Sequence, residues 1–110
     1  MVMYAFGEIV LVSGGTYTSK PRPVLVFQNE ESYTGESLIV IPFTTTSNEE
    51  IKTRIAISQT EQNGLDRDCF LEVDKLSAIN TAHIGETVGM LETDLIDKAK
   101  SFARKLLMLS

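Results

Sequence analysis

Four apolar stretches in the first half of the chain predict β-strands. Residues 7–14 are rich in β-branched side chains and end at two glycines, which is typical of a strand that runs into a turn. Residues 22–28 and 37–43 are almost continuously apolar and predict largely buried strands, the second of which ends or reaches an edge at its proline. Residues 51–57 alternate apolar with polar side chains, as a half-buried strand does.

The second half of the chain predicts shorter strands and then a helix. Residues 69–79 hold one or two short strands and residues 86–91 another, after a polar loop that turns at Asn63-Gly64. Thr93 is the expected N-cap of the helix. Apolar side chains recur behind it at helical spacing, at Leu95, Ile96, Ala99, Phe102, Ala103, Leu106 and Leu107.

This order of elements indicates the fold class. About six short strands precede one helix and no long strand–helix–strand unit occurs, so the sheet is expected to be mainly antiparallel and to curl into a small barrel. The fold class is therefore mainly β with a C-terminal α-helix. A chain of 110 residues without a linker or repeat suits one domain, 1–110.

Composition and charge narrow the function. The net charge of −5 argues against non-specific binding to duplex DNA but leaves room for a small basic site. No apolar run is long enough to cross a bilayer, and the first residues show no secretory signal, so a cytoplasmic protein is expected. With one cysteine, one histidine and no clustered carboxylates, no metal or other cofactor is expected. Cys69 is expected to be a buried inert thiol and His83 a surface or turn residue.

Two polar features are candidates for chemistry. Arg22 stands between Pro21 and Pro23 at the start of an apolar run. A guanidinium held there suits a phosphate or carboxylate ligand, although a surface ion pair would explain it equally well. The four hydroxyls of residues 44–47 follow a strand end, where they could bind a phosphate or simply form a polar turn.

In combination, these segments resemble a known family. "GEIVLV", "RPVLVFQN", "IVIPFTTTS", "DRDCFLEVDKLSAI" and "GML" before a terminal helix follow one another in the order found in the MazF/PemK (Kid) toxin endoribonucleases. The resemblance runs from residue 7 to about residue 107. It implies a barrel resembling an SH3 fold, of the MazF/CcdB type, in a homodimer. It also implies metal-independent cleavage of single-stranded RNA and inhibition by a cognate antitoxin with an acidic, flexible tail.

The resemblance also assigns residues. It makes Arg22 and Thr44 catalytic and Asp74 a candidate general base, because these positions match the family's motifs. The residues expected to bind RNA are Lys20, Gln28, Thr45, Thr46, Ser47 and Lys75. Many members have a Gln-Ile-Arg-Thr-like segment after the acid, and here Lys75 and Ser77 replace the Gln and the Arg. Glu72 stands where some members have a catalytic arginine, so a second basic group is missing or relocated.

The implied reaction uses the RNA's own 2′-hydroxyl as nucleophile and leaves a 2′,3′-cyclic phosphate and a 5′-hydroxyl, which would inhibit translation and growth. This would explain why no protein nucleophile is visible. Two alternatives remain open. A CcdB-like gyrase poison shares the fold but engages gyrase through a C-terminal tryptophan, which this chain lacks. A non-catalytic SH3-like module that binds RNA or a regulator is the other.

Overall fold

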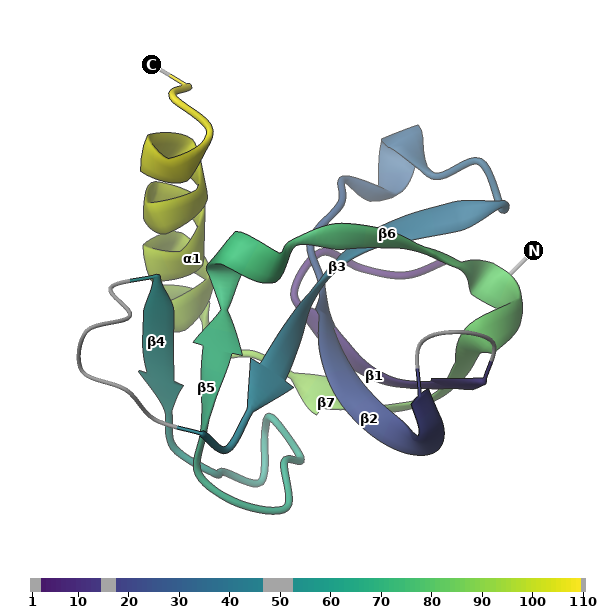
Figure 1. The fold of residues 1–110 in the computed structure, drawn as a ribbon, viewed down its shortest axis with the longest axis horizontal. Helices are drawn as coiled ribbons and strands as arrows, with labels where there is room; N and C mark the ends of the chain where they lie inside the picture. The colour runs from purple at the N-terminus through teal and green to yellow at the C-terminus, as the bar shows by residue number, and fades with distance from the viewer. Residues whose placement is uncertain (1–2, 15–17, 47–52, 110) are drawn as a thin grey trace.

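The computed structural model describes residues 3–14, 18–46 and 53–109. In this part of the chain, short strands form a curled sheet and one helix stands beside it (Figure 1). The strands are β1 (Glu8–Gly14), β2 (Thr18–Val26), β3 (Ser37–Thr44), β4 (Arg54–Ile57), β5 (Cys69–Glu72), β6 (Ser77–Asn80) and β7 (Ile84–Met90). The helices are α1 (Thr93–Leu106) and the single 3-10 turns η1 (Glu30–Ser32), η2 (Val73–Lys75) and η3 (Thr81–His83).

The sheet is antiparallel throughout the described residues. Its order is β4-β5-β3-β2-β1-β7, and β6 pairs with β3 beside this path. The expected antiparallel arrangement is confirmed, with seven strands where about six were predicted from pattern alone. The difference lies in the stretch after Cys69, which supplies three separate strands, β5, β6 and β7.

Strand β3 changes its partner halfway along. Residues 37–40 pair with β6, whereas Phe43 and Thr44 pair with β5. Pro42 lies between these two ladders and is paired only with Val24 of β2. A proline suits this position because it has no N–H to donate to a further strand. The two partner strands of β3, β6 and β5, therefore lie along different halves of it.

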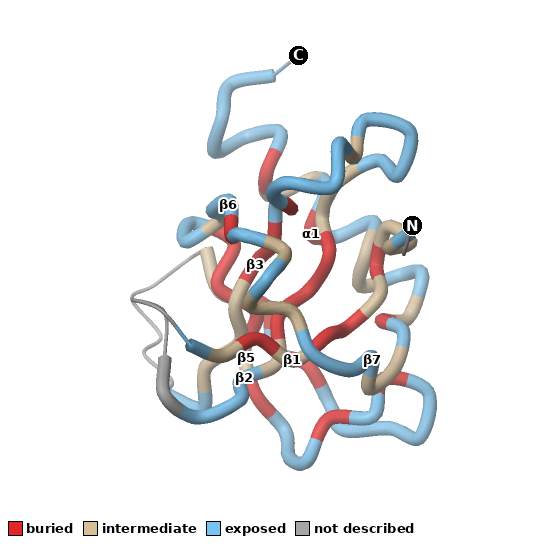
Figure 2. The backbone as a smooth tube through the Cα atoms, turned by 90° about the vertical axis from the view of Figure 1, so that its right-hand side faces the viewer, coloured by how far each residue is buried: buried red, intermediate tan, exposed pale blue. Residues whose placement is uncertain are grey.

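The sheet is buried on both faces at its centre, which explains the continuous apolar runs of the sequence. Neighbouring residues of β1, Ile9 and Val10, belong to two different clusters of buried side chains, and both are fully buried. The first cluster includes Ala99 and Ala103 of α1, whereas the second contains no residue of the helix. Figure 2 shows that the buried residues run along the middle of the strands. A strand between two such clusters needs an apolar side chain at every position rather than at alternate ones.

Helix α1 packs on the first of these clusters through the fully buried Ala99 and the nearly buried Ala103. The expectation that Thr93 is the N-cap is wrong by one residue, because the helix begins at Thr93 and Glu92 is the extended residue before it. Small side chains at the contact allow the helix to approach the sheet closely. No helix of the described residues is long and apolar enough to cross a membrane.

Candidate active site

A cleft of about 640 Å³ opens where β2 and β3 separate. Its walls come from the start of β2, the end of β3, the loop between β4 and β5, and the end of β5. All 3 prolines of the chain line it. The lining residues are Pro21, Arg22, Pro23, Pro42, Phe43, Thr44, Thr45, Thr46, Leu65, Asp66, Arg67, Cys69 and Glu72.

The cleft exists because β2 and β3 separate. Their ladder runs from Val26 to Val24 of β2, where Val24 faces Pro42. Beyond that pair, β2 continues along β1 alone, with Arg22 opposite Val12, while β3 turns to β5. The segments that follow the separation carry the arginine on one strand and the threonines on the other.

Arg22 is exposed at the edge of this cleft. Among the described residues, no carboxylate forms an ion pair with its guanidinium and no hydrogen bond involves it. The surface ion pair that would explain Arg22 equally well is therefore not seen in this part of the chain. Pro21 and Pro23 each fix their own backbone angle φ, so the backbone on both sides of Arg22 has few accessible conformations.

Thr44 is half-buried at the end of β3, opposite Phe70 of β5. Its Oγ1 accepts a hydrogen bond from the backbone N–H of Thr46 at 3.2 Å. Because the hydroxyl oxygen accepts here, the hydroxyl proton stays available to donate to a ligand. Thr45 and Thr46 are exposed and line the cleft with Thr44. The polar-turn reading and the site reading of this segment are thus both supported by the geometry.

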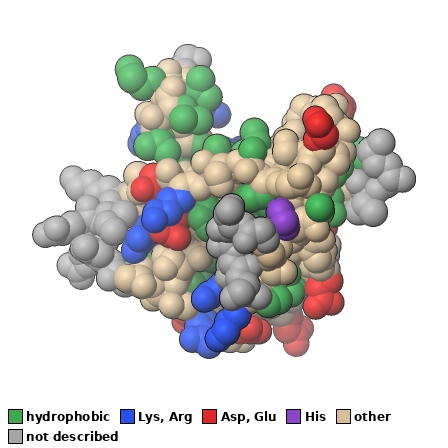
Figure 3. Space-filling view, turned by 45° about the vertical axis from the view of Figure 1, so that its right-hand side comes forward, with side chains coloured by type: hydrophobic (Ala, Val, Ile, Leu, Met, Phe, Trp, Pro, Cys, Tyr) green, Lys and Arg blue, Asp and Glu red, His purple; other side chains and the backbone are tan. Residues whose placement is uncertain are grey.

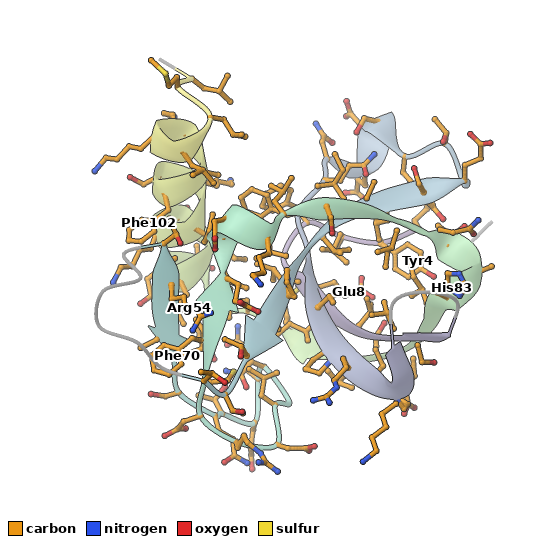
Figure 4. The ribbon with its side chains drawn as sticks, viewed as in Figure 1. Tyr4, Glu8, Arg54, Phe70, His83 and Phe102 are labelled. Atoms are coloured by element: carbon orange, nitrogen blue, oxygen red, sulfur yellow. The ribbon has the colours of Figure 1, made fainter. Side chains whose placement is uncertain are left out.

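A buried ion pair lies next to the threonines and was not predicted. Arg54 of β4 faces Glu72 of β5 across the ladder, and Nη2 donates to Oε2 at 3.2 Å. The Arg54 and Glu72 side chains are only 13% and 10% exposed. Figure 4 shows Arg54 at the β4–β5 pair. Glu72 stands at the position where some family members have a catalytic arginine. Arg54, on the neighbouring strand β4, places a basic side chain beside it.

The loop between β4 and β5 brings two further charged residues to the cleft, Asp66 and Arg67. Both are exposed, and sequence reasoning did not single them out. The loop is held against β7, where Met90 donates its N–H to the carbonyl of Gln62 at 2.9 Å. A Cβ added to Gly89 would lie 2.3 Å from the carbonyl oxygen of Asn63, so the backbones approach too closely for a side chain.

Asn63 is the anchor of this loop and is fully buried. Its Oδ1 accepts the N–H groups of Thr60 and Leu65, both at 3.1 Å. Its Nδ2 donates to the Ser58 carbonyl at 2.9 Å and to Glu92 at 3.2 Å. The side chain thus takes the place of a backbone ladder in a segment without regular structure.

The remaining predicted residues lie at varying distances from the cleft. Lys20 is exposed on β2, two residues before Arg22, and Ser47 lies outside the described residues. The structure does not bring Gln28 to the cleft, because its side chain bonds Ser32 and the Ile39 N–H instead. Asp74 is exposed in η2, just beyond Glu72 but not among the lining residues.

Lys75, also in η2, is exposed and has its Nζ 3.9 Å from Glu72 Oε2. His83 lies at the far side of the barrel from Arg54, away from the cleft (Figure 4). No group of three potential metal ligands occurs among the described residues.

Cys69 is buried in the wall of the cleft. Burial, together with the charge of Asp68, raises the pKa of its thiol to about 11. A thiol with such a pKa is almost entirely protonated near neutral pH and is a poor nucleophile. This agrees with the expected buried, inert thiol.

The chemistry of the cleft suits an anionic ligand. Arg22 and Arg67 offer guanidinium donors, and the threonines offer hydroxyls, all from lining residues. Two carboxylates, Asp66 and Glu72, also line the cleft. Figure 3 shows Lys and Arg side chains in separate places on one face, each with acidic side chains beside them. The fold and site together define the class as a small antiparallel barrel with a C-terminal helix and a cleft suited to phosphate groups.

Comparison with known proteins identifies the family. The PemK-like, MazF-like toxins of type II toxin–antitoxin systems match residues 5–107. The chain therefore belongs to this family. A curated relative from Mycolicibacterium smegmatis, a probable endoribonuclease MazF, is 37% identical over 83 residues, which are 74% of this chain and 76% of the relative. The expected class of protein, a type II toxin endoribonuclease, is confirmed.

Solved structures agree on the fold. An endoribonuclease from a mycobacterial species, in complex with its cognate antitoxin, superimposes with a TM-score of 0.78 at 17% identity over 97% of each chain. The MazE–MazF complex of Deinococcus radiodurans gives a TM-score of 0.79 at 16% identity over 100% of each chain. The expected barrel with a C-terminal helix is thereby confirmed.

Proposed function

We propose that this toxin cleaves single-stranded RNA at specific short sequences without a metal ion. Cleavage would leave a 2′,3′-cyclic phosphate and a 5′-hydroxyl, and the loss of mRNA would inhibit translation and growth. The observation that carries the proposal is that Arg22 and Thr44, which come from two different strands, line one cleft. The family membership and the named activity of the curated relative support the reaction class.

The chemistry follows from what these two side chains can do. The RNA 2′-oxygen attacks the adjacent phosphorus and forms a pentacovalent phosphate with extra negative charge. The bond to the 5′-oxygen then breaks. The Arg22 guanidinium would stabilise that charge with its planar fork of donors. Thr44 would add a hydroxyl hydrogen bond, since its oxygen already accepts from Thr46 and its proton is available.

Two protons must also move, one from the 2′-hydroxyl and one to the 5′-oxygen. The Arg22 guanidinium has N–H donors and no acceptor, so we assign it the donation to the leaving 5′-oxygen. Asp74 is proposed as the base, from its match to the family's acid. Replacement of Asp74 by Asn tests this role, because an unchanged cleavage rate would exclude it.

The RNA would bind across the cleft and beyond it. Thr45 and Thr46 are exposed in the lining. Lys20, next to the lining residue Pro21 in sequence, and Lys75, 3.9 Å from the lining residue Glu72, are exposed as well, so all four are proposed to contact RNA. Gln28 and Ser47 remain predictions from the resemblance.

The proposed partners are a second copy of the chain and a cognate antitoxin with an acidic, flexible tail over the same cleft. The complexes of related toxins with antitoxins support the latter. Large apolar side chains that are exposed, such as Met3 and Leu107, are available for a homodimer contact. A cytoplasmic location is proposed as well, because the mRNA substrate is found there.

One experiment separates the candidate functions. The purified protein is incubated with single-stranded RNA in EDTA, and the ends of any fragments are mapped. Cleavage with 2′,3′-cyclic phosphate ends supports the proposal. Intact RNA together with inhibition of DNA gyrase would instead make the protein a gyrase poison, and intact RNA without gyrase inhibition would make it a binding module.

A further inference from the structure

Arg54 joins two parts of the cleft wall that are distant in sequence. Its Nη2 donates to Glu72 on β5 at 3.2 Å, and its Nη1 donates to the carbonyl oxygen of Thr46 at 2.8 Å. The first contact is across the β4–β5 ladder, where Arg54 and Glu72 face each other. The second reaches the segment that follows β3. The planar fork of a guanidinium allows one side chain to make both contacts in fixed directions.

Thr46 connects Arg54 to Thr44 through two hydrogen bonds. Thr46 accepts the Arg54 hydrogen bond with its carbonyl and donates its own N–H to Thr44 Oγ1 at 3.2 Å. A continuous path of hydrogen bonds thus runs from Glu72 through Arg54 and Thr46 to the Thr44 hydroxyl. Each link fixes the direction of the next, and the last leaves the Thr44 proton available for a ligand.

The surroundings of Arg54 favour this fixed geometry. Its side chain is only 13% exposed. Its Nε is buried and has no hydrogen-bond partner among the described residues. Arg54 is not among the residues that line the cleft, whereas Glu72, Thr44 and Thr46 are. The guanidinium therefore supports the wall of the cleft from behind.

We propose that Arg54 is a positioning residue, which aims the Thr44 hydroxyl at the scissile phosphate by holding Thr46 against Glu72. The inference rests on the proposed function, because it assigns a reason for the orientation of a proposed catalytic side chain. It also accounts for Glu72. The carboxylate in the wall of a site for a polyanion is the fixed partner of the arginine that orients the threonine segment.

A double-mutant cycle tests the proposal. Arg54→Met, Thr44→Val and the double variant are compared with the parent in single-turnover cleavage of one RNA, with enzyme in excess and long incubation for slow variants. We expect Arg54→Met to lower the cleavage rate about 10- to 100-fold, as misplacement of a catalytic group does. In the Thr44→Val background, the same change should cost less than about 3-fold, because residues that act as one unit are not additive.

Two controls separate positioning from general damage. Arg104→Met removes an exposed arginine from α1 and should leave the rate unchanged. Arg54→Lys keeps a positive charge near Glu72 but cannot reach both partners in a fork, so it should fold like the parent and still lose rate. If Arg54→Met does not fold, the cycle is carried out with Arg54→Lys.

A spectroscopic measurement does not depend on activity. The amide resonance of Thr46 reports its hydrogen bond to Thr44 and should shift in the Arg54 variants. An equal loss of rate in both Thr44 backgrounds, or an unmoved Thr46 resonance, overturns the inference. A parent protein that leaves RNA intact instead overturns the proposed function, and a parent that cleaves while Arg54→Met cleaves equally fast overturns this inference alone.

Discussion

Asn63 donates a hydrogen bond from Nδ2 to Glu92 Oε1 at 3.2 Å, across 29 residues of sequence. Asn63 belongs to the loop between β4 and β5, and Glu92 is the residue before α1. Thr60 joins the same group and donates its hydroxyl to Glu92 Oε2 at 2.6 Å. The contact fixes the loop that lines the cleft to the start of the helix that covers the core.

Asn63→Ala should destabilise the protein by about 2–3 kcal/mol, because the buried N–H of Leu65 and the partly buried N–H of Thr60 lose their acceptor. Chemical denaturation of both proteins measures the change. Gln62→Ala is the matched control, since only the backbone carbonyl of Gln62 holds Met90 and its side chain is exposed. A loss of less than about 0.5 kcal/mol in Asn63→Ala would show that the loop does not depend on this side chain.

The same contact predicts a dependence of stability on pH. Burial alone would raise the pKa of Glu92, but hydrogen bonds from Thr60, the backbone and Asn63 outweigh it and lower the pKa below its ordinary value of 4.5. A lowered pKa in the folded state stabilises the protein above the unfolded value, and this contribution is lost as the pH falls through the folded value.

Melting temperatures measured from about pH 6 to pH 3 should consequently fall less steeply in Glu92→Gln than in the parent. The Gln variant should be the less stable protein at pH 6 and approach the parent in acid. Parallel curves for the two proteins would mean that Glu92 titrates alike in the folded and unfolded chains.

Arg22→Ala should reduce RNA cleavage by at least about 100-fold, because it removes the donors proposed to stabilise the pentacovalent phosphate. Stability should stay within about 0.5 kcal/mol, since the side chain is exposed and no hydrogen bond or ion pair holds it in the described part of the chain. Arg22→Lys keeps the charge without the planar fork and should recover only part of the rate. Cleavage by Arg22→Ala at the rate of the parent would remove Arg22 from the active site.

Cys69 should be alkylated slowly in the folded protein. Its pKa of about 11, against an ordinary 9.0, reduces the thiolate fraction near pH 8 about 100-fold. Iodoacetamide labelling followed by mass spectrometry measures the rate, with the unfolded protein in denaturant as the control. Equal rates in the two states would show that the thiol is accessible and ionised in the fold.

Much of the fold could be predicted because its strands carry strong local patterns. Continuous apolar runs gave β2 and β3, and the structure explains them by burial on two faces. The helical period gave α1. The joint placement of Arg22 and Thr44 in one active site was expected only from the family resemblance. Local sequence patterns could not predict it, because the separation of β2 and β3 at Val24 and Pro42 has no signature in the sequence.

The rest of the site depends on contacts between distant residues. Arg54 and Glu72 are 18 residues apart, and only strand register brings them together. Arg54 was expected to be part of a simple alternating strand, and Glu72 was noted only as a departure from the family. Gln28 was expected to bind RNA, but its side chain forms hydrogen bonds with Ser32 and with the N–H of Ile39 and does not line the cleft.

The prolines of the cleft have a consequence for how the protein behaves at high concentration. Where β2 and β3 separate, β2 pairs only with β1 among the residues that the structure describes, and an open strand edge invites an additional strand from another chain. Pro21 and Pro23 are two positions apart, so they present the same side of β2, and neither has an N–H for an incoming strand. The edge of β2 that borders the cleft is thereby protected against aggregation by β-pairing.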